Sequence, residues 1–155
     1  MESLKKLMLS LLACTMLWGC TVKDTAAGTT STSAAASIID ESGTYDSKED
    51  VALYLETYWH LPDNYMTKKE ARKEGWSGGA LSATIPGKCI GGDVYGNYEG
   101  TLPEVDGRTY YECDIDTLGK TKRGAERIIW STDQNIYYTE DHYDTFTLIY
   151  GDDAQ

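Results

Sequence analysis

A histidine in a polar turn near the C-terminal end is the first side chain that could do chemistry. His142 is one of only two histidines in the chain, and it lies in residues 137–147 between two segments typical of β-strands. Imidazole has an unperturbed pKa near neutrality, so it can give or take a proton at physiological pH. His142 is therefore a candidate for general acid–base catalysis, with a solvated surface histidine as the alternative.

A second group of candidates lies on one predicted strand and in the segment after it. Alternation over residues 108–115 places one polar set on a single face: Arg108, Tyr110, Glu112 and Asp114. Basic residues follow, namely Lys120, Lys122, Arg123 and Arg127. A carboxylate, a histidine and arginines are the groups that cleavage of an RNA phosphodiester requires. The 2′-hydroxyl loses a proton, the 5′-oxygen gains one, and fixed positive charge stabilises the phosphorane.

Helix signals precede these residues. Residues 47–50 resemble a capping box, so a first helix should start there and end before Pro62. Residues 67–70 form a fuller capping box for a short second helix, and residues 80–83 favour one further turn. Lys68 would then lie in the first helical turn, where the helix dipole disfavours a cation. It is either a solvated lysine or one that faces an anion.

After residue 88 the pattern changes to short runs rich in Tyr, Ile, Val and Thr, separated by Gly, Asn and Asp, which predicts antiparallel strands. We expect the strands at 89–95, 108–115, 127–131, 136–139 and 145–150. Helices followed by a meandering sheet indicate an α+β fold, with two to three short N-terminal helices on a five-stranded antiparallel sheet.

Two of the four cysteines lie on the first two predicted strands. If these strands pair through residues 96–107, Cys89 faces Cys113, and directly opposed residues can approach closely enough for a disulfide. In an exported protein we expect this bond, which would add about 3 kcal/mol of stability. Two buried free thiols are the alternative. No cysteine spacing fits zinc, so no metal site is predicted.

The N-terminal segment has the pattern of an export signal. In residues 1–19 two lysines precede an apolar run, which ends in Leu-Trp-Gly before Cys20 and resembles a bacterial lipobox. We expect cleavage there and lipidation of Cys20, which would anchor an extracellular protein to the membrane; free secretion is the alternative. Residues 20–46 are rich in Thr, Ser and Ala and should form a flexible tether. A domain at 47–151 and an acidic tail at 152–155 should follow.

Size and charge narrow the function classes. The 155 residues, 41% of them hydrophobic, are enough for one packed domain with a leader. The formal net charge of −11 argues against strong nonspecific attraction to nucleic acid, because such binding depends on Lys and Arg displacing counterions. Any contact with RNA must therefore be local.

From Val51 to Tyr150 the chain closely resembles the barnase-like family of small extracellular bacterial ribonucleases, which prefer guanosine. The matching blocks keep the family's order: Leu61-Pro62-Asp63-Asn64-Tyr65, Pro86-Gly87-Lys88, Ile90-Gly91-Gly92-Asp93, Glu99-Gly100, Leu102-Pro103, Gly107-Arg108-Thr109, Asp141-His142-Tyr143 and Thr145-Phe146-Thr147. This resemblance implies the microbial ribonuclease fold. It also implies cleavage of single-stranded RNA by transphosphorylation to a 2′,3′-cyclic phosphate, followed by hydrolysis, without a metal or organic cofactor.

The resemblance further implies catalytic roles. Glu112 would be the general base for the 2′-hydroxyl and His142 the general acid for the 5′-oxygen, with the roles exchanged in the hydrolytic step. Tyr143 would border the same site. The developing charge on the phosphate would be stabilised by Lys68, Arg123 and Arg127.

Recognition and structural roles follow in the same way. Glu99 would bind the guanine edge, and Asn97 would shape the pocket. Tyr98 stands where relatives carry Arg, and it offers an aromatic face on which a base can stack. The family's structural contacts would be an ion pair of Arg108 with Asp133, and Asp114 holding the arginines.

A noncatalytic surface module of the same fold, which binds a barstar-like partner or a nucleotide, is the alternative function. The presence of Glu112, Arg123, Arg127 and His142 favours the enzyme. We expect a monomer that acts on single-stranded RNA. A barstar-like inhibitor is a second expected partner, although the acidic surface weakens the attraction that such inhibitors use.

Overall fold

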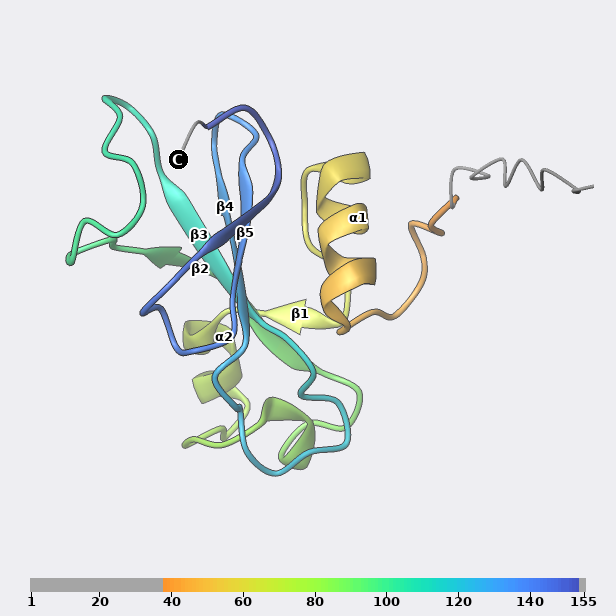
Figure 1. The fold of residues 1–155 in the computed structure, drawn as a ribbon. Helices are drawn as coiled ribbons and strands as arrows, with labels where there is room; N and C mark the ends of the chain where they lie inside the picture. The colour runs from red at the N-terminus through yellow and green to blue at the C-terminus, as the bar shows by residue number, and fades with distance from the viewer. Residues whose placement is uncertain (1–37, 154–155) are drawn as a thin grey trace, which may run out of the picture. The chain divides into compact units, whose positions relative to one another are not determined.

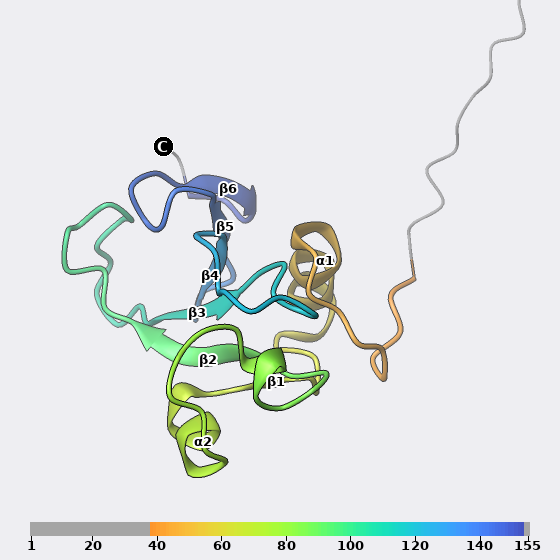
Figure 2. The same ribbon diagram turned by 90° about the horizontal axis from the view of Figure 1, so that it is seen from below.

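The computed structural model describes residues 38–153, which belong to one compact unit (Figures 1 and 2). The expected signal peptide at 1–19, the lipidation site Cys20 and most of the expected tether lie outside the described residues. Within 38–153, no helix is long and apolar enough to cross a membrane.

Both predicted helices begin at their predicted caps. Helix α1 (Lys48–Tyr58) starts after Ser47, whose side chain accepts a hydrogen bond from the backbone N–H of Asp50. Helix α2 (Lys68–Lys73) starts with a complete capping box between Thr67 and Glu70. These bonds satisfy N–H groups that have no partner within a helix. The expected further turn is the 3₁₀ helix η1 (Leu81–Ala83).

The predicted antiparallel meander is present. Its strands pair in chain order and are β2 (Cys89–Tyr95), β3 (Tyr110–Asp114), β4 (Arg127–Ser131), β5 (Ile136–Thr139) and β6 (Thr147–Tyr150). A sixth strand, β1 (Tyr65–Met66), adds in parallel to β2. Its two residues carry too short a pattern to be predicted.

The two faces of the sheet bury different residues. On one face Val51 and Leu55 of α1 pack against Ile128 and Cys113. Ile129, the next residue of β4, belongs to a second cluster with Tyr110 and Tyr137, because successive side chains of a strand point to opposite faces. Glu112 is paired with Ile129 in the ladder and shares its face. The candidate carboxylate therefore lies on the side of the sheet away from α1.

The predicted disulfide between Cys89 and Cys113 is wrong, and both buried thiols are free. Cys113 pairs with Gly91, while Cys89 pairs with Tyr65 of β1. The ladder is offset from the expected register along its whole length, since Asp93 pairs with Glu112 and Tyr95 with Tyr110, and the pattern of the two strands alone does not fix how they align. Burial raises the pKa of the Cys89 thiol to about 11, so it stays protonated at neutral pH.

The folded unit starts before the predicted boundary at Ser47. Ile39 is buried, and the hydroxyls of Tyr54 and Tyr58 donate to the carbonyls of Glu41 and Ile39 at 2.8 and 2.7 Å. Residues 38–46 of the expected tether therefore pack on α1. Bonds to backbone carbonyls need no particular partner side chain, so the composition of this segment did not reveal them.

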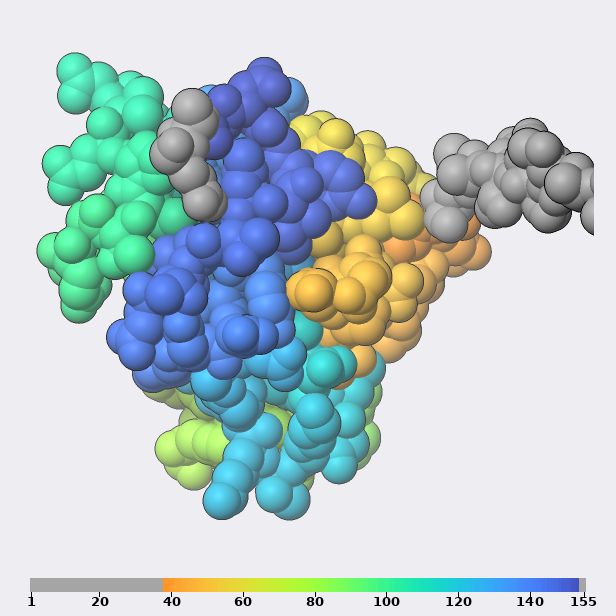
Figure 3. Space-filling model, viewed as in Figure 1, coloured from red at the N-terminus to blue at the C-terminus, as the bar shows by residue number. Residues whose placement is uncertain are grey.

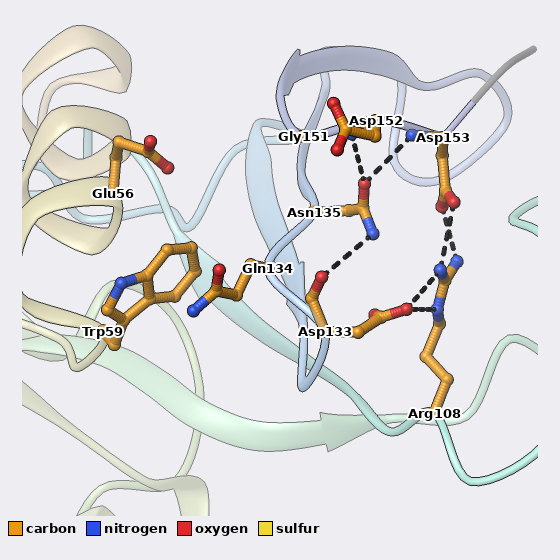
Figure 4. Close-up of a pocket in the computed structure, with 9 residues that line it drawn as sticks. All are labelled: Glu56, Trp59, Arg108, Asp133, Gln134, Asn135, Gly151, Asp152 and Asp153. Atoms are coloured by element: carbon orange, nitrogen blue, oxygen red, sulfur yellow. Dashed lines mark hydrogen bonds and ion pairs between the residues drawn. The ribbon is translucent and has the colours of Figure 1, made fainter.

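The first two residues of the expected acidic tail, Asp152 and Asp153, are also part of the fold, as Figure 4 shows. Arg108 pairs with Asp133, as predicted, and also binds Asp153 with two bonds of 2.5 and 3.0 Å. The Asn135 side chain accepts from the backbone N–H groups of Asp152 and Asp153 at 3.0 and 3.1 Å. The residues that make these contacts line a hollow of about 440 Å³. Glu112 and the residues that bind it do not line this hollow.

Candidate active site

Glu112 lies in the middle of β3, and both of its carboxylate oxygens are occupied. It is 7% exposed. Lys68 Nζ lies 2.5 Å from Oε1, and the Tyr143 hydroxyl donates to Oε2 at 2.5 Å. The lysine at the unfavourable end of α2 thus faces an anion. The backbone N–H of Lys68 also donates to Asp93 at 2.8 Å, which ties the start of α2 to β2.

Asp114, two residues further along β3, holds both predicted arginines. Strand periodicity puts it on the same face as Glu112, and it lies opposite Arg127 in the β3–β4 ladder. Its carboxylate binds Arg123 through two bonds of 2.6 Å and Arg127 at 3.1 Å. The bonds to Asp114 raise the pKa of the Arg123 guanidinium, so its charge is permanent.

Arg127 is almost completely buried, at 1% exposed. Its guanidinium donates to the backbone carbonyls of Glu126 and Gly124 at 2.6 and 3.2 Å, and its Nε donates to the Tyr143 hydroxyl at 3.2 Å. Because these contacts hold the group in one orientation, its positive charge needs no reorganisation when an anion binds.

His142 is exposed in the turn between β5 and β6, beside this cluster. Its ring centre lies 4.8 Å from that of Tyr143, and both residues have left-handed backbones, with φ of 62° and 78°. Asp141 stabilises the turn by accepting bonds from the hydroxyls of Thr139 and Thr145 and from the Thr145 N–H, at 2.6 to 2.9 Å. These bonds, chiefly those from Thr145, lower the pKa of Asp141 to about 2.

Aromatic rings form the wall beside Glu112. Tyr95 stacks on Tyr143 with ring centres 5.2 Å apart and an angle of 18°, and Phe146 meets Tyr95 edge-on at 6.0 Å. Burial, and then the hydrogen bond to Glu112, raise the pKa of Tyr143. Its hydroxyl therefore remains a proton donor to the carboxylate at neutral pH.

The predicted base-recognition residues lie on the loop after β2. The Asn97 side chain bonds the N–H and C=O of Leu102 at 3.0 and 2.9 Å, so it shapes the loop. Tyr98 is 94% exposed and Glu99 is also exposed. Tyr95, the last residue of β2, connects this loop with the Glu112 cluster, because its ring stacks on Tyr143, which bonds Glu112. Burial, and then the charges of Glu99 and Glu112, raise the pKa of Tyr95.

The structure thus brings Glu112 together with Lys68, Tyr143, Asp114, Arg123 and Arg127. Sequence reasoning missed Asp93, Tyr95 and Asp141 as positioning residues. Tyr95 and Asp93 are two positions apart on β2, a spacing that could have placed them on one face with the site. For Asp141 the signal is its spacing from Thr145, four residues later, because an Asp side chain often accepts hydrogen bonds from residues that follow it in a turn.

The fold and the Glu112 cluster define a small α+β protein with a buried carboxylate beside fixed cations. A profile of the ribonuclease family matches residues 48–150. The ribonucleases of Bacillus intermedius and Heyndrickxia coagulans are each 50% identical over 103 residues, which are 65% of this chain and 63% and 94% of theirs. Guanyl-specific ribonuclease Sa of Kitasatospora aureofaciens is 44% identical over 59 residues, 37% of this chain and 62% of that protein.

The match spans less than two thirds of the Bacillus intermedius relative and nearly all of the Heyndrickxia coagulans one. The chain belongs to the ribonuclease family, and its fold is that of the microbial ribonucleases. The family resemblance drawn from the sequence is confirmed.

Proposed function

We propose that the chain is an endoribonuclease that cleaves single-stranded RNA after guanosine. The observation that carries this proposal is the pair of bonds at Glu112, where Lys68 and Tyr143 hold a buried carboxylate next to fixed arginines. A general base and a phosphate-binding site therefore lie next to each other. Attack of a ribose 2′-hydroxyl on the adjacent 3′-phosphate requires this arrangement.

In the first step Glu112 takes the proton of the 2′-hydroxyl, and O2′ attacks the phosphorus. Binding of the phosphate gives Lys68 and Tyr143 new acceptors and frees a carboxylate oxygen for the 2′-hydroxyl. Arg127 needs no movement to meet the charge that develops on the phosphorane, because buried contacts already orient it.

The P–O5′ bond then breaks, and His142 donates a proton to the leaving 5′-oxygen. The product is a 2′,3′-cyclic phosphate. In the second step His142 takes a proton from water, which attacks the phosphorus, and Glu112 returns a proton to O2′. The product is a 3′-phosphate. The exposed position of His142 in its turn suits a group that must meet both water and the leaving nucleotide.

Guanine recognition is assigned to the loop after β2. Glu99 would accept two hydrogen bonds from the guanine edge, and the ring of Tyr98, an exposed residue, would stack on a base. A relative of this chain is named a guanyl-specific ribonuclease, which supports the preference.

A guanosine-containing dinucleotide, incubated with the protein in EDTA, should yield a 2′,3′-cyclic phosphate. Glu112→Ala should lower kcat/KM by about 10²- to 10⁴-fold, the usual contribution of a positioned base. Glu74→Ala, at an exposed position of the α2 C-cap, is the matched control and should retain activity. Absence of cleavage by the wild type, or equal cleavage by Glu112→Ala, would disprove the proposal.

We also propose export and lipid anchoring through Cys20, supported by the signal-like residues 1–19. Cells that express the full chain should incorporate a labelled fatty acid into the protein and hold it in the membrane fraction. The Cys20→Ser variant should take up no label. Label in that variant, or none in the wild type, would refute lipidation at this residue.

A further inference from the structure

Positive charge is concentrated in two short segments of this acidic protein. Residues 68–73 and 120–127 hold eight of the eleven Lys and Arg side chains found in residues 38–153, but only two of the 23 carboxylates. Five of the eight are exposed: Lys69, Arg72, Lys73, Lys120 and Lys122. No ion pair detected among the described residues includes any of these five.

The two segments lie together. The loop between β3 and β4 contacts the segment after α2, where the Ala80 N–H donates to the Thr121 carbonyl at 3.0 Å. Arg72 of α2 and Arg123 of the loop both approach the ring of Trp76, with guanidinium carbons 5.8 and 6.0 Å from its centre. Figure 3 shows α2 and this loop together at the lower end of the molecule. We call the five exposed cations the cationic end.

The cationic end continues from the active site. Arg123 binds Asp114 next to Glu112 and also touches Trp76, so it links the catalytic cluster with Arg72. The base-recognition loop precedes β3 and the loop of the cationic end follows it, as Figure 1 shows. Glu112, in the middle of β3, lies between the two loops. A strand that binds its guanosine at the first loop and its scissile phosphate at Glu112 is directed toward the cationic end.

We propose that the cationic end binds phosphates of the RNA strand on the 3′ side of the cleaved bond. This inference rests on the proposed function, because the base loop and Glu112 define the direction of the strand. Phosphates are the partners that complement a local group of exposed cations in a protein whose net charge repels polyanions elsewhere. The proposal also explains how a chain with net charge −11 can bind RNA at all.

The test measures binding, so it does not depend on cleavage. The full-length protein is titrated with a fluorescent oligonucleotide that carries one 2′-deoxyguanosine followed by six uridines. The deoxyguanosine lacks the 2′-hydroxyl that would attack the phosphate after it. A dinucleotide and an oligonucleotide with the six uridines on the 5′ side serve for comparison. The variants are Lys69→Gln/Lys73→Gln and Lys120→Gln/Lys122→Gln. The matched control, Lys48→Gln/Lys88→Gln, removes the same charge from outside the cationic end.

Each lost phosphate contact reduces the slope of log affinity against log salt by about 0.7 for a single strand. For two lost contacts, the affinity ratio of wild type to variant for the 3′-extended oligonucleotide should fall about sevenfold between 50 and 200 mM salt. Dinucleotide binding and the control variant should keep the wild-type slope. Slopes equal to that of the control would overturn the proposal and leave an acidic protein as the ligand of this surface.

A slope change with the 5′-extended oligonucleotide alone would also overturn the proposal, because it would reverse the direction of the strand. If the wild type cuts no guanosine dinucleotide but the variants still lose slope, the proposed function fails and the phosphate-binding surface stands. If the wild type cuts the guanosine dinucleotide but the variants keep the wild-type slope, the proposed function stands and the phosphate-binding surface fails.

Discussion

The Asp153→Asn variant tests whether the C-terminal residues stabilise the fold through Arg108. The Arg108 side chain is only 5% exposed and is bound by Asp153 and Asp133, whose side chains are 18% and 46% exposed. Asp153 also accepts a bond from the hydroxyl of Tyr137, a buried residue of β5. The substitution removes one charge from this network and leaves Arg108 with its more exposed partner.

The expected loss is about 2 kcal/mol, within the range for hydrogen bonds to charged groups. It is smaller than the cost of stranding a buried charge completely, because Asp133 remains. With a urea m value of about 2 kcal/mol per molar, the midpoint of unfolding should fall by about 1 M. Asp152→Asn is the matched control, because the contact of that residue with the fold is made by its backbone N–H.

The pH dependence adds a second check. Hydrogen bonds from Arg108 hold the pKa of Asp153 below its usual value of 3.8. A carboxyl with a lowered folded-state pKa contributes stability above its unfolded pKa and loses it as the pH falls through the folded value. The difference between wild type and Asp153→Asn should therefore be present at pH 7 and vanish in acid. Equal midpoints for the Asp153 and Asp152 variants at pH 7 would refute the reasoning.

Four further predictions concern the sheet, its two thiols and the catalytic turn. Gly91→Ala should destabilise the fold by about 1 to 3 kcal/mol in urea unfolding, because its Cβ would lie 2.6 Å from that of Cys113. Dithiothreitol should leave the unfolding midpoint unchanged, since these thiols form no disulfide. With the pKa of Cys89 at about 11, stability should fall as the pH rises from about 9 to 11, and less steeply in Cys89→Ala. Asp141→Ala should lower kcat on the order of tenfold or more with little change in KM, because the turn that presents His142 loses its bonds.

Local rules of the chain predicted most of the secondary structure. The caps at Ser47 and Thr67 depend on side chains within three residues, so they could be read directly. The five strands of the meander followed from residue type and turn spacing. The position of Glu112 and Asp114 on one face followed from strand alternation. For Lys68 the sequence offered two interpretations, a solvated lysine or one that faces an anion, and the tertiary structure decided for the anion. The roles of the site residues came from the family resemblance.

Features that depend on register and on distant contacts were decided only by the tertiary structure. The β2–β3 ladder forms in a register that puts Gly91, not Cys89, opposite Cys113, and this register depends on the geometry of the connecting loop, which no local pattern of the strands records. The packing of Ile39 and the binding of Asp153 to Arg108 join residues more than ten positions apart in the chain. The residue pattern grouped Lys120 and Lys122 with the two arginines that follow them, but it did not connect them with the cations of α2. Their gathering beside Trp76 and the active site is a consequence of how the β3–β4 loop packs on the segment after α2.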